Sequence, residues 1–321
     1  MESIADQTTP RRVVVLGASG TIGRATVAAL VAHGHAVTAL VRRPLAFSGA
    51  VVRIGEATDP ATLAAVLAGA DAVVSCLASR TGVPADAWAV DHGANLAALA
   101  AAQTAGVGHF VLLSAICVQR PRLAFQHAKL AFEAALQASG MPWTIVRPTA
   151  FFKSLSGQVA RVRAGKPFLV FADGTLNACR PIAAADLAAY LADCVERPDR
   201  RGRILPIGGP GPALTPRAQG ELLFALTGRS PRFTHVPVRL LDAIIAGLSL
   251  AGRVVPRLAA KAELARIGRY YATESMLVWD AAAGRYDAAA TPATGSITLA
   301  DHYAALLAGA TTDDRGEHAV F

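Results

Sequence analysis

The sequence is poor in cysteine and in charge, and each shortage excludes a class of protein. Its 321 residues include four cysteines, which are far apart and form no CxxC pair. We therefore expect no disulfide scaffold, and reduced thiols of the kind found in a cytoplasm. Charged residues make up 17% and apolar residues 53%, which excludes a disordered chain and is typical of a compact globular protein. We find no histidine pair or cysteine cluster suited to a metal and predict none.

Long apolar runs are also missing. The strongly apolar segment from Arg239 to Leu250 is a dozen residues long and carries Asp242. A bilayer core about 30 Å thick needs a longer helix, so this segment is predicted to be a lid, a core helix or a helix lying at a membrane surface. Residues 1–12 are polar and lack the apolar core of a signal peptide, which favours a cytoplasmic location.

The formal net charge of +8 is concentrated in one stretch. Between Arg229 and Arg269 there are eight basic and two acidic residues, so this stretch holds six of the eight net charges. A nucleic-acid-binding protein more often spreads its basic residues through the fold and mixes them with aromatics, so we predict no nucleic-acid partner. The stretch indicates a membrane surface or an acidic ligand, with a solvated helical face as the alternative.

A glycine turn follows the first apolar run. Val13 to Leu16 suits a strand buried on both faces, and the pattern becomes helical from Arg24. The residues expected to contact a cofactor in this turn are Gly17, Ser19, Gly20, Thr21, Ile22 and Gly23. The first glycine permits the sharp turn, the second leaves room for a pyrophosphate, and the third lets the helix pack closely on the strand. The spacing is GxxGxxG rather than GxGxxG, yet the strand and helix around it predict a dinucleotide site rather than a plain glycine-rich loop.

The second apolar run identifies the expected cofactor. Ala36 to Val41 is predicted to be a strand, and it ends in Arg42 and Arg43, where the adenosine ribose of a dinucleotide would lie. An acidic residue there would bind the ribose 2′-hydroxyl, whereas arginine can pair with a 2′-phosphate. We therefore predict NADPH rather than NADH.

Strand and helix patterns alternate up to about residue 150. Further strands are predicted at 51–54, 71–77, 109–114 and 143–146, with helices at 61–67 and 90–105. This alternation predicts an α/β protein with a Rossmann-like, doubly wound parallel sheet that binds its ligand at the strand carboxyl ends. Further residues expected near the cofactor at those ends are Cys76, Leu77, Ala78, Pro148 and Thr149.

We divide the chain into an NADP-binding domain at 1–150 and a smaller C-terminal substrate-binding subdomain at 151–321. The second part is expected to contain strands at 167–171 and 204–207, a helix capped by Asp186 and another capped by Thr215. It ends in apolar and basic helices and, beyond Thr311, in a frayed tail.

The expected catalytic residues follow the fifth strand. In short-chain dehydrogenases a serine ends this strand and a Tyr-x-x-x-Lys pair follows; here Ser114 and Lys129 are present, but Phe125 replaces the tyrosine. The spacing places Phe125 and Lys129 on one helix face, so Lys129 can hold the nicotinamide ribose. Phe125 cannot donate a proton, which argues against an ordinary carbonyl reductase. His127, on another face, is expected at the surface or in a supporting position.

Lys153 is one of only four lysines and directly follows the sixth strand. We expect it to meet a substrate carboxylate or a phosphate, with an ordinary surface lysine as the alternative.

Several later segments resemble one family over nearly the whole chain. They are FVLLSAICVQ at 110–119, FQHAKL at 125–130, VRPTAFFKSLSGQ at 146–158, ATESML at 272–277, GRYD at 284–287 and TP at 291–292. On these segments the chain resembles the divinyl chlorophyllide a 8-vinyl reductases, atypical short-chain dehydrogenases related to NmrA-like and isoflavone-reductase-like proteins. The resemblance implies NADPH-dependent reduction of the 8-vinyl group of divinyl chlorophyllide or protochlorophyllide to ethyl, in chlorophyll or bacteriochlorophyll synthesis. Any magnesium would arrive with this tetrapyrrole.

The implied reaction explains the missing tyrosine. Hydride added to the vinyl terminus leaves a charge that the macrocycle spreads, so no acid for an oxyanion is needed. Water, Lys153, Cys117 and Ser114 all remain open as the proton source. The basic C-terminal part suits the ring propionate or an anionic membrane, so a peripheral place at the photosynthetic membrane is compatible with the sequence. The oligomeric state stays open. Alternatives are an alkene reductase for another conjugated aromatic and a non-catalytic NADP-sensing regulator or assembly subunit.

Overall fold

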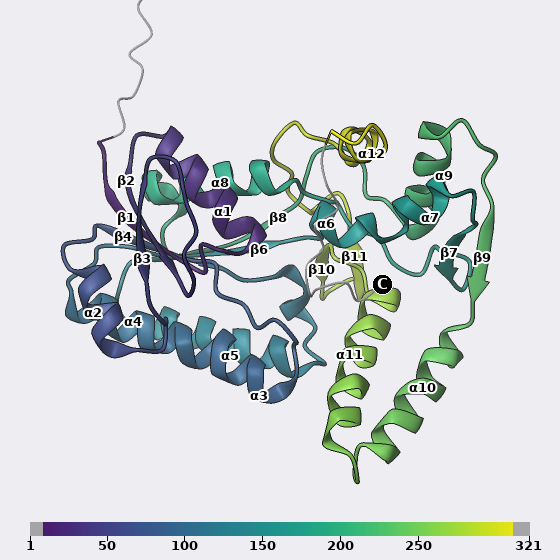
Figure 1. Cartoon of the computed structure of the whole chain (residues 1–321), viewed down its shortest axis with the longest axis horizontal. Coiled ribbons are helices and arrows are strands. Elements are labelled where there is room, and N and C mark those ends of the chain that lie inside the picture. The colour runs from purple at the N-terminus through teal and green to yellow at the C-terminus, as the bar shows by residue number, and fades with distance from the viewer. Residues whose placement is uncertain (1–8, 311–321) are drawn as a thin grey trace, which may run out of the picture.

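The computed structural model describes residues 9–310, built around a seven-stranded parallel sheet (Figure 1). The strand order is β3-β2-β1-β4-β5-β6-β8. Strands β2 and β3 are added on one side of β1 and the later strands on the other side, so the order of strand addition reverses between β1 and β4. The strands are β1 Arg12–Leu16, β2 Ala36–Val41, β3 Ala50–Ile54, β4 Ala72–Ser75, β5 Phe110–Leu113, β6 Trp143–Pro148 and β8 Arg203–Ile207. This confirms the predicted doubly wound α/β fold, in which ligands bind beside such a reversal.

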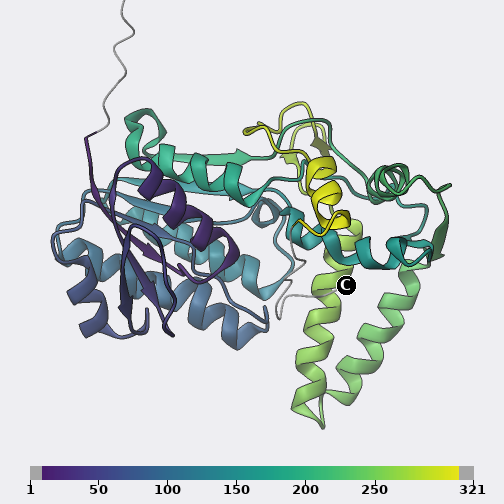
Figure 2. The same cartoon turned by 45° about the horizontal axis from the view of Figure 1, so that its top comes forward.

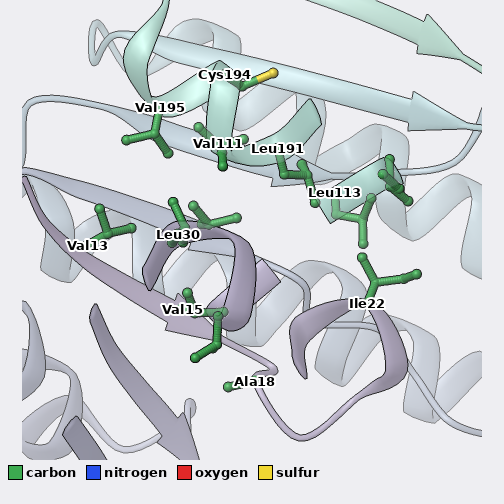
Figure 3. Close-up of a cluster of buried hydrophobic side chains, with 14 of the residues drawn as sticks. Val13, Val15, Ala18, Ile22, Leu30, Val111, Leu113, Leu191, Cys194 and Val195 are labelled. Atoms are coloured by element: carbon green, nitrogen blue, oxygen red, sulfur yellow. The ribbon is translucent and has the colours of Figure 1, made fainter. Parts of the chain in front are cut away.

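Helices cover both faces of the sheet. On one face lie α1 Thr21–Ala32 and α8 Ala184–Glu196; on the other lie α2 Pro60–Leu67, α4 Asn95–Thr104 and α5 Ala124–Ala138, with the short α3 Pro84–Ala87 beside α5 (Figure 1). Alternate residues of β1 point to the two faces, so Val13 and Val15 pack under α1 and α8 while Val14 and Leu16 pack on the other side. Figure 3 shows the first of these clusters, where Leu30 and Leu191 meet the strand residues.

The single helix predicted at 90–105 is interrupted. It consists of a π-helix, η1 Trp88–Ala94, followed directly by α4. Asn95 lies at the junction, where its side-chain oxygen accepts a hydrogen bond from Ser75 and its amide nitrogen donates to the carbonyl of Asp91, at 2.6 and 3.1 Å. The wider turn is of the kind often found at functional sites, and it brings Asp91 into the interior.

The domain boundary expected at residue 150 needs correction. Strand β8 pairs with β6 in the central sheet, and α8 packs beside α1, so residues 184–207 belong to the nucleotide-binding layer. The expected helix cap is also wrong: α8 begins at Ala184 with Ala183 as its cap. Asp186 lies in the first turn and accepts the backbone N–H of Ile297 at 3.0 Å, because the later chain folds back over this helix.

The smaller part of the molecule has a core of its own. Strands β7 Phe168–Phe171 and β9 Phe233–Val236 form a parallel pair, and Val278–Asp280 (β10) and Arg285–Asp287 (β11) form a short antiparallel pair. Its helices are α6 Phe152–Leu155, η3 Ser156–Gln158, α7 Val159–Arg163, α9 Pro216–Leu226 and α12 Leu299–Leu307. Two further short helical turns belong to the sheet layer: η2 Ile116–Gln119 after β5 and η4 Pro198–Arg200 after α8. Thr215 caps α9 as predicted, accepting the N–H of Ala218 at 3.2 Å. The expected tail from Thr311 lies outside the described residues.

Two helices project from the body as a hairpin (Figures 1 and 2). They are α10 Val238–Ala251 and α11 Pro256–Thr273. No residue of α10 is buried, which excludes a core helix, one of the three alternatives for this segment. None of the helices within residues 9–310 has the length and hydropathy needed to cross a membrane.

Candidate active site

The glycine turn has the geometry of a dinucleotide site. Gly17 has φ +71°, and a Cβ there would lie 2.6 Å from the carbonyl oxygen of Cys76, while a Cβ on Gly23 would lie 2.2 Å from that of Gly17. Both positions therefore require glycine for close packing. At Gly20 a Cβ would meet only the Gly17 oxygen, at 3.4 Å, so its outer side is open.

The start of α1 is free to receive an anion. Its cap is Gly20, which has no side chain to bond the first N–H groups, and its first turn contains no acidic residue. Unpaired N–H groups and the positive end of the helix dipole together favour a phosphate. The turn therefore fits the pyrophosphate of a dinucleotide. Ser19 and Thr21 are exposed beside it, whereas the side chain of Ile22 is buried in the core, so only its backbone faces the turn.

Two arginines and two strand exits frame the rest of the cofactor site. Arg42 and Arg43 follow β2 at the same sheet edge and are exposed, so their side chains can reach a 2′-phosphate. Cys76, Leu77 and Ala78 leave β4, and packing around the Cys76 sulfur raises its pKa to about 12, which removes it as a nucleophile.

The exit of β6 is fixed by backbone contacts. The hydroxyl of Thr149 donates to the carbonyl of Arg180, and its N–H donates to Ile207 at 2.9 Å. Pro148, the last residue of β6, is buried. These contacts attach β6 to β8 and to the segment before α8.

Lys129 is oriented by a residue that the sequence analysis missed. Its ammonium nitrogen lies 2.9 Å from a carboxylate oxygen of Asp91, whose side chain is 1% exposed. Asp91 also accepts the N–H of Ser79 just after β4, at 3.4 Å. The pair thus links α5, the π-helix and the cofactor edge of the sheet. No sequence spacing could reveal it, because it depends on a π-helix.

Ser114 is engaged elsewhere. Its hydroxyl donates to Glu133 at 2.5 Å, and the same buried carboxylate forms an ion pair with Arg147. The side chain thus faces the α5–β6 interface rather than offering a proton to a ligand.

Phe125 belongs to an apolar cluster. It packs with Cys117, Leu123, Ile267 and Tyr270, so its ring helps to attach α11 to the body. Burial raises the pKa of the Cys117 thiol. His127, on another face of α5, is exposed, as predicted.

Lys153 lies over the glycine turn. Its ammonium group donates to the Thr21 hydroxyl at 3.0 Å, on the first residue of α1. Of the two ligands expected for it, a phosphate and a substrate carboxylate, this position favours the phosphate.

Arginines line a cavity beside this site. A cavity of about 160 Å³ lies between the start of α5 and helix α11. Its lining residues are Arg122, Leu123, Arg266, Arg269, Tyr270 and Thr273. Each of its three guanidinium groups already pairs with a carboxylate of the protein: Arg122 with Glu274, Arg266 with Glu263 and Arg269 with Asp242. Because a guanidinium group has five N–H donors, the cavity can still take a carboxylate that shares them.

One group of possible metal ligands lies away from this site. A ring nitrogen of His33 and carboxylate oxygens of Asp193 and Glu196 lie within 4.8 Å of one another, a grouping that the sequence analysis did not anticipate. They sit at the far end of α1 from the glycine turn, roughly 18 Å along a twelve-residue helix. The His33 nitrogen is already 2.9 Å from Glu196.

The fold and the site define an NAD(P)H-binding protein. Residues 17–198 match the family model described as NAD(P)H-binding. Among solved structures, the NADPH-dependent quinone oxidoreductase QOR2 of Escherichia coli is similar in fold, with a TM-score of 0.68 at 20% identity over 92% of this chain and 99% of that one.

Sequence comparison narrows the class. The chain is 46% identical to the chloroplastic divinyl chlorophyllide a 8-vinyl-reductase of Zea mays, over 96% of this chain and 82% of that protein. It is 44% identical to the enzyme of the same name from Arabidopsis thaliana, over 92% of this chain and 76% of that protein. The chain belongs to the divinyl chlorophyllide a 8-vinyl-reductase family, which confirms the predicted resemblance.

Proposed function

We propose that this protein uses NADPH to reduce the 8-vinyl group of a divinyl magnesium chlorophyllide to an ethyl group. The observation that carries the proposal is a site with complete cofactor geometry but with Phe125 where a carbonyl reductase has its acid. Membership of the vinyl-reductase family supplies the substrate class.

The chain's own residues would hold the cofactor along the sheet edge. The glycine turn and Lys153, which bonds Thr21, would hold the pyrophosphate. Arg42 and Arg43 would pair with the 2′-phosphate, and Lys129, oriented by Asp91, would bond the nicotinamide ribose. NADPH, when bound, supplies a hydride.

The apolar surroundings suit a vinyl group rather than a carbonyl. A carbonyl oxygen would become an alkoxide and would need an acid where Phe125 stands. A vinyl group attached to a macrocycle spreads the developing charge over the conjugated ring, so no hydrogen-bond donor is required at that position. The phenyl ring instead offers a flat apolar contact.

The arginine cavity would bind the propionate of the pigment. At about 160 Å³ it can take a side chain but not the macrocycle, which would lie outside it along α5 and α11. An Arg269→Ala variant, which leaves the ion pairs of Glu274 intact, should raise the KM for the free acid and leave the KM for its methyl ester unchanged. Equal effects on both substrates would contradict this assignment.

The decisive test is the reaction itself. Purified protein, NADPH and divinyl chlorophyllide should give the monovinyl pigment, seen as a blue shift of its absorption and confirmed by mass. If the protein binds NADPH but no pigment changes, the proposal is wrong and a non-catalytic NADP-binding role replaces it.

The α10–α11 hairpin, residues 238–273, is proposed as a peripheral membrane contact. Apolar side chains at its tip and along α10 are exposed, with Leu240 at 51%, Leu250 at 65% and Val254 at 84%. Basic residues that form no ion pair within residues 9–310 accompany them: Arg239, Arg253, Arg257 and Lys261. An apolar strip beside basic residues suits the surface of an anionic bilayer.

Flotation with vesicles tests this contact. We expect binding to vesicles that contain phosphatidylglycerol, little binding to phosphatidylcholine alone, and loss of binding in the Leu250→Glu/Val254→Glu variant. An exposed residue on the far side of the molecule, changed as Val51→Glu, serves as control. Equal flotation of all three proteins would contradict the proposal.

A further inference from the structure

The proposed reaction needs a proton after the hydride, and the groups first considered for it are engaged. The hydroxyl of Ser114 donates a hydrogen bond to Glu133. The ammonium group of Lys153 donates one to Thr21, above the phosphate site. Cys117 is only 4% exposed, so its thiol is shielded from a bound pigment. Of the sources first considered this leaves water, unless another residue reaches the substrate.

Helix α11 brings a tyrosine to this place. Tyr271 packs against the cluster that contains Phe125, and its hydroxyl lies 3.8 Å from the sulfur of Cys117. Cys117 lies in the turn that follows β5, at the edge of the sheet where the cofactor binds. The charge of Asp91, the partner of Lys129, also acts on this phenol. The hydroxyl thus lies among residues beside the nicotinamide end of the site.

The hydroxyl of Tyr271 is not committed to an oxygen acceptor, unlike those of other tyrosines in the same part of the fold. The hydroxyl groups of Tyr270, Tyr286 and Tyr303 donate to oxygen atoms at 3.0, 2.7 and 2.9 Å. Within residues 9–310 the Tyr271 hydroxyl meets only the sulfur of Cys117, at 3.8 Å, and sulfur is a weak hydrogen-bond partner. It can therefore turn towards a bound substrate.

The position of this residue is nonetheless fixed. Its carbonyl accepts a hydrogen bond from the side chain of Asn177 at 3.2 Å. Three residues later, Glu274 forms ion pairs with Arg120 at 3.1 Å and Arg122 at 2.7 Å. These contacts hold the end of α11 against the sheet edge, so the phenol is preorganised.

We propose that Tyr271 is the catalytic proton donor of the vinyl reduction. It lies on α11 and takes the role of the tyrosine that is absent at position 125 on α5. The inference rests on the proposed function. The terminal vinyl carbon gains the hydride that NADPH supplies, and the π electrons move to the inner carbon and the macrocycle. The O–H bond of Tyr271 then breaks as a C–H bond forms at the inner carbon. The products are the ethyl group, NADP⁺ and a phenolate, which regains a proton from water.

The surroundings keep this phenol protonated until it is needed. Burial raises the pKa of Tyr271 well above its ordinary value, and nearby Cys117 acts in the same direction. A neutral phenol is the form that can donate, and the carbanion-like charge on the reduced pigment is a strong enough base to take its proton.

The Tyr271→Phe variant tests the assignment, because it removes one oxygen and no packing. We expect kcat to fall by about 100-fold or more, the usual share of a general acid. The dissociation constants of NADPH and pigment, measured by fluorescence, should stay unchanged. Tyr303→Phe is the matched control: this buried tyrosine loses its hydrogen bond to the Leu155 carbonyl, so the variant should have a lower melting temperature and a kcat close to that of the wild type.

A second readout follows the proton itself. In D₂O the wild-type protein should place deuterium on one face of the inner vinyl carbon, whereas Tyr271→Phe should place it on both faces, because water then delivers it. A variant with wild-type kcat and one-sided labelling would overturn the role of Tyr271. A wild-type protein that reduces no pigment would instead contradict the proposed function.

Discussion

Among single residues, the Lys129–Asp91 pair best shows how this site is built. Lys129 is 11% exposed and Asp91 1%, so both charges are largely removed from water. Removing two charges from water costs free energy, which their mutual attraction and hydrogen bonding offset. Loss of one partner leaves the other as an unpaired buried charge. The pair therefore serves the fold and the cofactor site together.

Asp91→Asn should weaken both functions. We expect the free energy of unfolding to fall by about 3 kcal/mol, because Lys129 loses its buried partner. The KM for NADPH should rise as the lysine loses its orientation. Chemical denaturation and steady-state kinetics measure the two effects. In the Asp91→Asn/Lys129→Met variant stability should recover while activity stays lost; recovery of activity would show that Lys129 is not needed.

Arg42 and Arg43 should set the choice of cofactor. In the Arg42→Ala/Arg43→Ala variant we expect the KM for NADPH to rise by about tenfold or more, since hydrogen bonds to a charged group each contribute about 1.5–3 kcal/mol. The KM for NADH should stay unchanged, because that cofactor has no 2′-phosphate. Parallel changes for both cofactors would place the arginines elsewhere in the site.

Sequence reasoning at this scale predicted site residues from their position along the chain. The glycines, Arg42 and the Phe125–Lys129 spacing lie at strand exits or one helical turn apart, so local pattern was enough to propose them. Asp91 and Tyr271 were missed, because their partners lie far away in the sequence and are brought close only by packing.

At the scale of elements, two glycines in the turn between β1 and α1 have different roles: Gly23 is needed for packing and Gly20 for NADPH binding. Gly23→Ala would place a Cβ 2.2 Å from the Gly17 oxygen. This should cost about 3 kcal/mol of stability. At Gly20 the nearest atom is 3.4 Å away, so Gly20→Ala should keep the melting temperature of the wild type but weaken NADPH binding. Thermal melts and cofactor titration distinguish the two; a stable Gly23→Ala protein would contradict the packing described.

Strands were easier to predict than helices. The expected strand at 36–41 matches β2, a largely buried apolar run between turns. The one expected at 51–54 differs by one residue from β3, an exposed edge strand recognised by its β-branched residues. The π-helix and the cap of α8 were not predictable. Both depend on tertiary partners: Asn95 with Ser75 in the first case, and Asp186 with the chain near Ile297 in the second.

At the scale of the whole molecule, buried histidines make stability depend on pH. Burial, together with the charge of Arg201, lowers the pKa of His109 from 6.5 to about 4, and burial lowers that of His35 as well. Between about pH 4 and pH 6.5 the unfolded chain therefore binds a proton at His109 that the folded protein does not bind. The stabilisation is complete above about pH 6.5 and is lost as the pH falls towards 4.

The predicted slope is measurable. Between pH 6 and 4.5 the free energy of unfolding should fall by about 1.4 kcal/mol per pH unit for His109 alone. Denaturant titrations at several pH values give this slope. His109→Gln keeps a hydrogen-bonding group near Thr144, which lies 3.0 Å from the His109 nitrogen, and should flatten the curve. An unchanged slope in that variant would assign the effect to other groups.

The return of β8 to the central sheet also determines when the cofactor site can form during synthesis. A ribosome that has released only the first 150 residues has made β5 and β6 but not β8, which pairs with the other edge of β6, nor α8, which covers Val13 and Leu30. The nascent chain would carry an open strand edge and an uncovered apolar face until residue 207 has emerged. Residues 151–183 must therefore be made before the nucleotide-binding layer closes, and their two ends are attached to the same sheet. This first portion of the substrate-facing part is thus a loop held at both ends, whereas the rest of that part follows β8.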